Sequence, residues 1–181
     1  MRVRVLFLFL FCAVGNAASH ISVGYFDKTL YAGRTPKMPI EMLEPAKSYE
    51  RGGFLMAKSS VGEFLFLHIN GGGNYGYWKE ANRTTQTTSS FLSLEVPILS
   101  LFGVRLFLEG SIFGPSYLFE KRDKISQKRF AYQQFLTLGL SIGRMQGLTL
   151  ELSIFQYTGM QNIFDDSLLT TPLLLSTGIT F

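Results

Sequence analysis

Strict alternation of apolar and polar residues is the feature that most constrains how this chain folds. Leucine or isoleucine occupies every second position in residues 136–142 and 148–154, and residues 92–96 and 104–109 follow a similar pattern. A period of two residues is that of a β-strand with one apolar face. The sequence therefore predicts an all-β protein, with strands at 19–26, 48–58, 62–77, 87–99, 103–119, 129–143, 147–158 and 170–181.

The predicted connections between these strands alternate in length. Tight turns are expected after the second, fourth and sixth strands, at residues 59–61, 100–102 and 144–146. Longer polar segments follow the other strands, at residues 27–47, 79–86, 120–128 and 159–169. Short turns on one rim and long loops on the other are typical of small outer-membrane barrels. The pattern predicts an eight-stranded antiparallel transmembrane up-and-down β-barrel, with the turns and both termini in the periplasm.

A soluble secreted barrel of the lipocalin type fits the same length and is the main rival fold. Its outward positions are polar, whereas one face of each clear strand here is nearly uninterrupted Leu, Ile and Val. A charge that faces hydrocarbon costs about 2–4 kcal/mol near the bilayer midplane. We therefore expect the charged residues of the strands to point into the lumen, with Arg105 and Glu109 as a candidate ion pair in a plugged, non-conducting barrel. The four charged residues concerned are Glu95, Arg105, Glu109 and Glu151.

The N-terminus has the features of a secretory signal peptide. Arg2 and Arg4 precede an apolar run over residues 5–14, and Gly15 and Ala17 supply the small residues that signal peptidase reads. We expect cleavage after Ala17, which gives a signal peptide of residues 1–17 and a barrel of residues 18–181. The predicted location is the outer membrane of a Gram-negative bacterium.

Composition narrows the classes of partner and cofactor. The chain has one Cys and two His residues, which excludes a disulfide framework and a structural zinc site, and we expect no metal or other cofactor. The formal net charge is only +4, and Arg2 and Arg4 account for half of it. So weak a basic balance argues against a nucleic-acid partner.

The last residues and the aromatic residues near the strand ends also favour a membrane barrel. Ile179, Thr180 and Phe181 form an apolar-x-aromatic ending that resembles the signal by which the barrel assembly machinery recognises a C-terminal strand. Aromatic side chains at the predicted rims are expected to form a girdle at the membrane interface. These are Tyr75, Tyr77, Trp78, Tyr117, Phe119, Phe130 and Tyr132.

Three segments in order resemble the lipid A deacylases, a PagL-type family of outer-membrane barrels also described as acyloxyacyl-hydrolase-like. Residues 72–78 (GGNYGYW) are similar to the family's aromatic strand end. Residues 107–115 (FLEGSIFGP) and 130–139 (FAYQQFLTLG) resemble two strands that follow. The resemblance implies a barrel that removes a 3-O-linked acyl chain from lipopolysaccharide.

The positions that match the family's catalytic residues differ in this chain. In the family, a His removes the proton of a Ser nucleophile and a Glu orients the His, at a site that faces the lipid. The resemblance places the His at Gln156, the Ser at Thr158 and the Glu at Thr171, all three expected on the lipid face. Gln does not accept a proton at neutral pH and Thr carries no negative charge, so we expect a degenerate site.

Two alternatives to a degenerate deacylase remain. One is an active ester hydrolase with a rearranged site that uses Thr158 or a loop carboxylate, Asp165 or Asp166. The other is a non-enzymatic structural or surface-binding barrel. Its support is a set of basic residues in one predicted loop, with Lys79 and Arg83 in another, since such groups can pair with the phosphates of lipopolysaccharide. The candidate headgroup-binding residues are Lys121, Arg122, Lys124, Lys128 and Arg129.

Overall fold

The computed structural model describes residues 19–27, 49–122, 125–143, 147–159, 167–171 and 173–181. No helix among these residues is long and apolar enough to span a membrane. The strands are β1 (Ser19–Asp27), β2 (Tyr49–Phe64), β3 (Leu67–Glu80), β4 (Arg83–Leu101), β5 (Val104–Phe113), β6 (Pro115–Arg122), β7 (Ile125–Ile142), β8 (Gly147–Gly159), β9 (Ser167–Thr170) and β10 (Leu174–Thr180).

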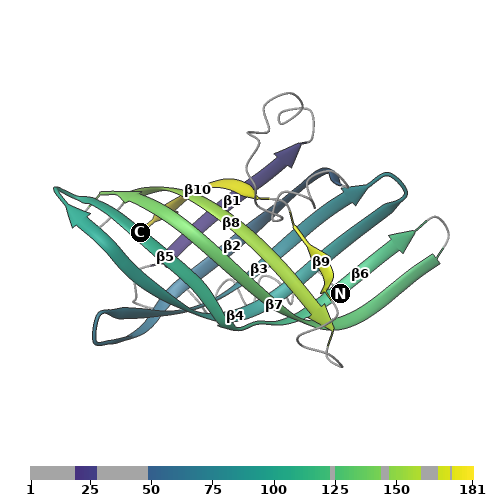
Figure 1. The fold of residues 1–181 in the computed structure, drawn as a ribbon, viewed down its shortest axis with the longest axis horizontal. Coiled ribbons are helices and arrows are strands. Elements are labelled where there is room, and N and C mark those ends of the chain that lie inside the picture. The colour runs from purple at the N-terminus through teal and green to yellow at the C-terminus, as the bar shows by residue number, and fades with distance from the viewer. Residues whose placement is uncertain (1–18, 28–48, 123–124, 144–146, 160–166, 172) are drawn as a thin grey trace.

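All of these strands belong to one antiparallel sheet that closes on itself (Figure 1). β5 and β6 pair with successive parts of β4 and β7 and together act as one strand of the ring. β9 and β10 do the same along β8. β1 closes the ring against β10, in a register that runs from His20↔Thr180 to Tyr25↔Leu175. The prediction of an eight-stranded, antiparallel up-and-down barrel is confirmed.

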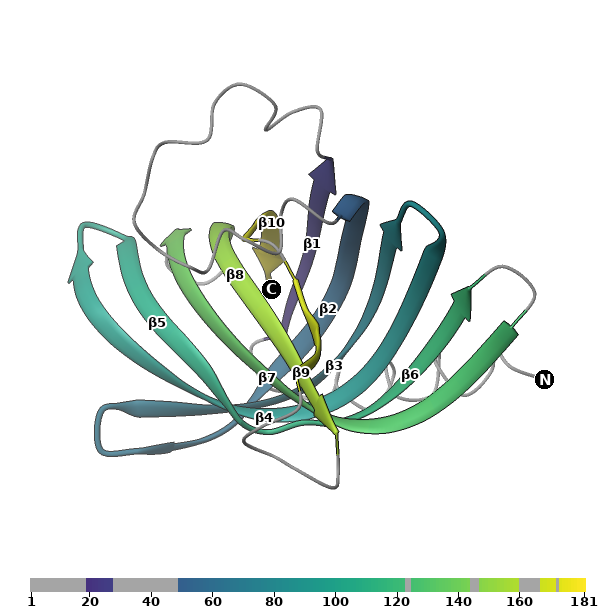
Figure 2. The ribbon, with the colours of Figure 1, turned by 45° about the vertical axis from the view of Figure 1, so that its right-hand side comes forward.

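The barrel has two distinct ends (Figure 2). At the turn end, β2 and β3 are joined through Leu65 and Phe66, and β4 and β5 through Phe102 and Gly103. Ser19 and Phe181 lie at this end and exchange backbone hydrogen bonds of 2.9 Å. At the loop end, β3 and β4 are joined through Ala81 and Asn82, and the β6–β7 hairpin projects beyond its neighbours.

Several predicted boundaries are wrong. The turn expected at residues 59–61 is part of β2, which continues to Phe64 through a register shift between Ser60 and Gly62. The loop expected at residues 79–86 is a two-residue turn, because β3 and β4 stay paired as far as Glu80 and Arg83. Most of the loop expected at residues 120–128 is likewise strand, with Arg122 paired to Ile125. Serine and charged residues indicated loops here, yet cross-strand pairing accommodates them on exposed strand ends.

Two predicted strands are each divided in the structure. The strand expected at residues 103–119 is interrupted at Gly114, where an added Cβ would lie 2.5 Å from the backbone oxygen of Gln133. Only glycine permits so close an approach of two backbones. In the strand expected at residues 170–181, only Thr170 and β10 are strand, and the other residues of β9 fall in the loop expected at 159–169, which is wrong there. The predicted signal peptide, the turn at residues 144–146 and most of the loop at 27–47 lie outside the described residues.

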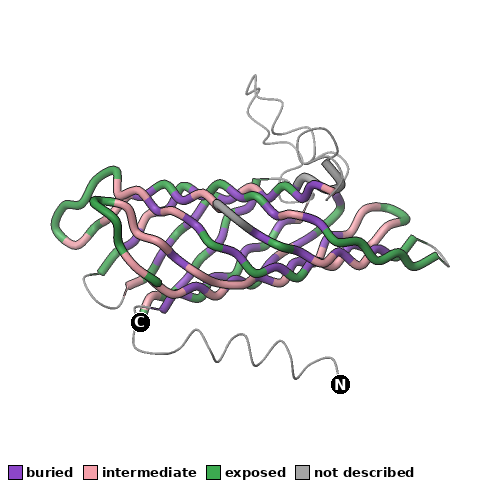
Figure 3. The backbone as a smooth tube through the Cα atoms, turned by 90° about the horizontal axis from the view of Figure 1, so that it is seen from below, coloured by how far each residue is buried: buried purple, intermediate pink, exposed green. Residues whose placement is uncertain are grey.

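Burial alternates along the strands as the sequence predicts (Figure 3). On β8, Leu148, Leu150 and Leu152 are 62%, 50% and 40% exposed, whereas Glu151 and Ser153 are buried. The same outward apolar face continues over β4, β5, β7, β10 and β1. We call this set of exposed residues the apolar belt: Ile21, Val23, Leu92, Leu108, Leu136, Leu138, Leu148, Leu150, Leu152, Leu175 and Ile179.

Aromatic side chains fill the half of the interior nearer the loop end. The rings of Phe54 and Phe155 lie 4.8 Å apart and those of Phe91 and Phe135 5.0 Å apart, both in edge-on arrangements. Trp78, expected in the outer girdle, is only 1% exposed and belongs to this interior cluster. The prediction failed because neighbouring residues of a strand face opposite sides, so Trp78 lies inside whereas Tyr77 lies outside.

Glycines on neighbouring strands make room for three of the large interior rings. Phe54 pairs across the sheet with Gly24, Trp78 with Gly52, and Phe107 with Gly139. A Cβ added at any of these glycines would lie within 2.5 Å of the facing ring. This alternation of large and absent side chains lets the rings fit into the narrow interior.

Candidate functional site

Gln156, at the position that matches the family's His, lies on the outer face of β8. It is exposed, as expected, and pairs with Gln134 of β7 on one side and Thr170 of β9 on the other. Phe155 and Tyr157, its neighbours in sequence, are buried in the interior as predicted. The amide of Gln156 lies beside a second amide rather than beside a general base.

Thr158, at the position that matches the family's Ser, is buried. The sequence places it on the lipid face, yet only 2% of the residue is exposed. It lies in the sheet between Tyr132 of β7 and Ser167 of β9, at a register shift that begins after Tyr157. Its hydroxyl makes no hydrogen bond to any other described residue. Burial between two strands therefore denies this hydroxyl both a base and open access to a substrate.

Thr171, at the position that matches the family's Glu, faces the interior instead of the lipid. It is fully buried, its amide donates to the Phe155 oxygen at 2.9 Å, and its hydroxyl accepts the Phe155 amide at 2.9 Å. The expected lipid-facing orientation is wrong because the register along β8 shifts by one residue between β10 and β9. One residue of slip moves a side chain to the other face of a strand.

The three positions therefore meet at one end of β8 without forming a catalytic arrangement. The two imidazoles of the chain lie at the other end of the barrel, where His20 contacts Thr180 and His68 contacts Glu63. Asp165 and Asp166 lie outside the described residues. The described groups around Gln156 supply neither a proton acceptor nor a negative charge.

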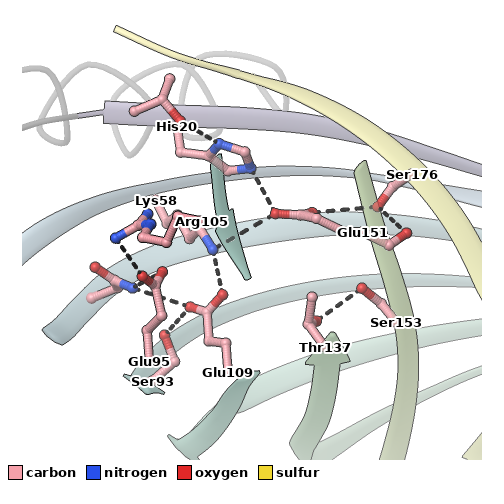
Figure 4. A network of polar contacts seen from close by, with 12 residues as sticks. His20, Lys58, Ser93, Glu95, Arg105, Glu109, Thr137, Glu151, Ser153 and Ser176 are labelled. Carbon is pink, nitrogen blue, oxygen red and sulfur yellow. Dashed lines mark hydrogen bonds and ion pairs between the residues drawn. The ribbon is translucent and has the colours of Figure 1, made fainter. Parts of the chain in front are cut away.

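A charged network occupies the interior near the turn end (Figure 4). The fully buried carboxylate of Glu109 forms an ion pair with Lys58 and accepts a 2.6 Å hydrogen bond from Ser93. Glu95 lies 2.9 Å from the guanidinium of Arg105. The expectation that Glu95, Glu109 and Glu151 face the lumen is confirmed, but the expected pairing of Arg105 with Glu109 is wrong. Lys58, from β2, takes the place of Arg105 because it enters the lumen opposite Glu109.

Glu151 connects this network to the strands that close the ring. The Nε2 atom of His20 lies 3.0 Å from one Glu151 oxygen, and Ser176 donates a 3.3 Å hydrogen bond to the other. His20 is on β1 and Ser176 on β10. Glu151, on β8, therefore joins both sides of the closing seam. Lys58 was missed by the sequence analysis, although its position two residues after Met56 and four after Phe54 puts it on the same inward face.

A cavity of about 200 Å³ opens beside this network at the turn end. Its lining includes His20, Lys58, His68 and Arg105. The described residues contain no cluster of three or more His, Cys, Asp or Glu side chains that would hold a metal ion. The charges in this region are paired with one another and stabilise the interior.

The basic residues of the loop predicted at residues 120–128 lie on the projecting β6–β7 hairpin. Lys121, Arg122, Lys128 and Arg129 are all exposed. Lys124 lies outside the described residues. Glu120, next to this set in sequence, is buried and forms an ion pair with Arg83. The hairpin therefore presents its positive charges outward while the carboxylate beside them is neutralised inside.

The other two predicted loop cations are already paired. Lys79 lies 2.8 Å from a carboxylate oxygen of Glu50, and Arg83 binds Glu120. Among the basic residues named from the sequence, those on the β6–β7 hairpin are left as the candidate surface for anions.

No protein-family model matches this chain, and no curated protein matches it.

Replacing Lys58 with Met is expected to destabilise the barrel by about 3–5 kcal/mol, because it leaves the buried Glu109 carboxylate without its cation. Adding Glu109→Gln to Lys58→Met should recover part of that loss, since the second substitution removes the unpaired charge. Reversible urea unfolding, followed by the fluorescence of Trp78, measures both effects. Arg105→Met is the matched control, with a smaller loss because its side chain is 36% exposed. An equal or larger loss in Arg105→Met would contradict this account.

Proposed function

We propose that this protein is an integral outer-membrane β-barrel of a Gram-negative bacterium, with strand β10 as the segment that the barrel assembly machinery recognises. The observation that carries the proposal is the apolar belt, which exposes leucine, isoleucine and valine on β4, β5, β7, β8, β10 and β1, strands that are neighbours in the ring. Soluble monomers rarely expose contiguous apolar surface on this scale. A closed ring also satisfies every backbone group without an open edge, which a lipid environment requires.

A charge introduced into the apolar belt tests the lipid environment directly. Leu150→Arg is expected to lose about 2–4 kcal/mol of stability in phospholipid vesicles, because the guanidinium would face hydrocarbon. On a water-exposed surface the same change is worth within about 0.5 kcal/mol. Thr88→Arg, on an exposed outward position of β4 nearer the loop end, is the control and should change little. Gels of unheated and heated samples across a urea series measure both.

Equal stability of Leu150→Arg and the parent protein, or recovery of the parent in periplasmic extract, would contradict the membrane proposal.

The interior supports a barrel that does not conduct. An eight-stranded ring is just wide enough for side chains to fill. Here one half of the interior is closed by the aromatic cluster around Phe135 and Phe155, and the other half holds the ion pairs of Lys58 and Arg105. The protein is thus proposed to act through its outer surface and its ends rather than as a pore.

We further propose that the resemblance to lipid A deacylases is one of scaffold without ester hydrolysis. Gln156 lacks a basic atom, Thr158 is buried between strands, and the Thr171 hydroxyl binds the backbone of Phe155. Loss of key members of a triad leaves only residual catalysis. These three positions support a barrel that lies in the membrane without deacylating lipid A.

Lipid A incubated with the folded protein is expected to keep all of its ester-linked acyl chains. Mass spectra of the lipid, and of the free fatty acids released, measure this outcome. Thr158→Ala is the matched variant and should give spectra identical to those of the parent. Release of a 3-hydroxy fatty acid by the parent, and its loss in Thr158→Ala, would instead establish an active hydrolase with a rearranged site.

A second candidate function is recognition of the phosphates of lipopolysaccharide by the β6–β7 hairpin. Its support is the exposure of Lys121, Arg122, Lys128 and Arg129 on one projecting element, with Glu120 turned inward. Basic groups near an anionic lipid surface are worth about 1 kcal/mol each. Four such groups are enough to distinguish phosphorylated from dephosphorylated lipid.

Replacing the four exposed cations of the hairpin with Gln is expected to weaken binding of lipid A. About 1 kcal/mol per group corresponds to roughly fivefold per removed charge. Titration of fluorescent lipid A into the barrel in a zwitterionic detergent measures the change, and dephosphorylated lipid A is the control ligand. Equal affinity of the parent for the two lipids would contradict phosphate recognition.

A further inference from the structure

The apolar part of the outer surface is displaced toward the turn end. On β4 the outward residues of the loop half are polar, whereas those from Leu92 to Ile98 are apolar. On β7 the aliphatic row begins at Leu136 after Gln134, with the outward aromatic residues Tyr132 and Phe130 farther toward the loop end. On β8 the change falls between Gln156 and Ile154. The polar outward residues of β4 are Thr84, Gln86, Thr88 and Ser90.

The sheet register aligns these changes across four strands. Leu94 pairs with Gly110, Gly110 with Leu136, and Leu136 with Ile154. The apolar surface therefore begins along one continuous line that crosses β4, β5, β7 and β8. This line lies well short of the loop end, and beyond it the outward residues are mostly polar, with the exposed Phe130 and Ile125 of β7 as exceptions.

At the turn end, the described hairpin tips expose large apolar side chains. Phe102 is 99% exposed and Leu65 is 82% exposed, each at the tip of a hairpin. Both adopt positive φ angles, 51° for Phe102 and 58° for Leu65, a backbone conformation that disfavours bulky side chains. Most exposed residues around them are also apolar, with Glu63 and Ser100 as the polar exceptions. The apolar ones are Val61, Phe64, Phe66, Ile98, Leu99, Leu101 and Val104.

The opposite rim has a different chemistry. The β3–β4 turn consists of Ala81 and Asn82, and Lys121 and Arg122 lie near the tip of the β6–β7 hairpin. At the turn end, the exposed Glu63 of the β2–β3 hairpin is paired with His68, and Arg105 is paired with Glu95. The polar rim therefore suits water, and the apolar tips of the turn end suit a non-aqueous phase.

The length of the apolar stretch on β4 indicates that this non-aqueous phase is the hydrocarbon core of a bilayer. A tilted strand crosses the hydrocarbon core in about 9–11 residues. On β4, about ten residues from Leu92 reach Leu101, which immediately precedes the turn at Phe102. A hydrocarbon layer that begins at the line defined above therefore ends at the β4–β5 turn. No further strand residues remain on that side to extend into water.

We propose that the β2–β3 and β4–β5 turns are immersed in lipid, so that Leu65 and Phe102 contact acyl chains at the inner boundary of the bilayer while the loop end stands clear of the membrane. This inference rests on the proposed function, because it requires the apolar belt to face lipid. It goes further by fixing the depth of the barrel. Acyl chains are expected at the tips because the apolar side chains of the two hairpins continue the apolar belt.

Tryptophan quenching by brominated lipid tests this placement. The chain has a single tryptophan, Trp78, which is buried. Its fluorescence is therefore quenched little by either reagent, and the change in emission comes from the added tryptophan. Phe102→Trp and Leu65→Trp are compared, in vesicles of phosphatidylcholine with or without bromine on the acyl chains, with Leu150→Trp in the belt and Ile125→Trp on the loop-end hairpin. Two tip variants keep the test valid if one fails to fold.

The expected result is loss of the added emission by half or more in brominated vesicles for both tip variants and for Leu150→Trp. Ile125→Trp should be quenched by aqueous iodide instead. Iodide quenching of the tip variants, with Leu150→Trp still quenched by bromine, would overturn the immersion and leave the membrane barrel intact. Tip variants quenched by neither reagent would overturn it in favour of a second copy or another protein. Iodide quenching of Leu150→Trp would overturn both proposals.

Discussion

Closure of the sheet between β1 and β10 is the constraint on which the other features depend. A closed ring with a side-chain period of two leaves each strand residue one of two environments, a narrow interior or the outer surface. An eight-stranded interior is just wide enough for side chains to fill, so Lys58, Glu95 and Glu109 are taken out of bulk solvent, while the side chain of Arg105 stays 36% exposed. The pairing of Lys58 with Glu109 and of Arg105 with Glu95 follows from that requirement.

The two halves of the interior meet this constraint in different ways. Toward the loop end, edge-on aromatic contacts fill the space, and glycines on neighbouring strands make room for Phe54 and Trp78. Toward the turn end, carboxylates and cations from several strands satisfy one another. Glu151 links the strands of the seam directly, because it contacts His20 of β1 and Ser176 of β10. Packing therefore fixes one half of the barrel, and charge pairing holds the other half closed.

The sequence predicted what depends on alternation within one strand, and failed where several strands decide the outcome. The inward positions of Glu109, Glu151, Phe155 and Tyr157 follow from parity alone, and all four are buried. The partner of Glu109 depends on how β2 and β5 meet across the lumen, which no local pattern encodes. The strand ends depend on cross-strand pairing, so polar residues that indicated loops at 79–86 lie mainly in strands.

The register slip beside β8 also bears on how far this barrel lies from an active lipid hydrolase. Restoring His and Ser at Gln156 and Thr158 would place an imidazole on the outer face, but a Glu at Thr171 would still point inward toward Phe155. The carboxylate and the imidazole would then lie on opposite faces of the sheet, where no orienting hydrogen bond forms between them. Catalysis at this position would need the irregularity between Thr170 and Leu174 to be removed as well as the three side chains replaced. Under the proposed resemblance to lipid A deacylases, the difference is therefore one of backbone register as well as of side-chain chemistry.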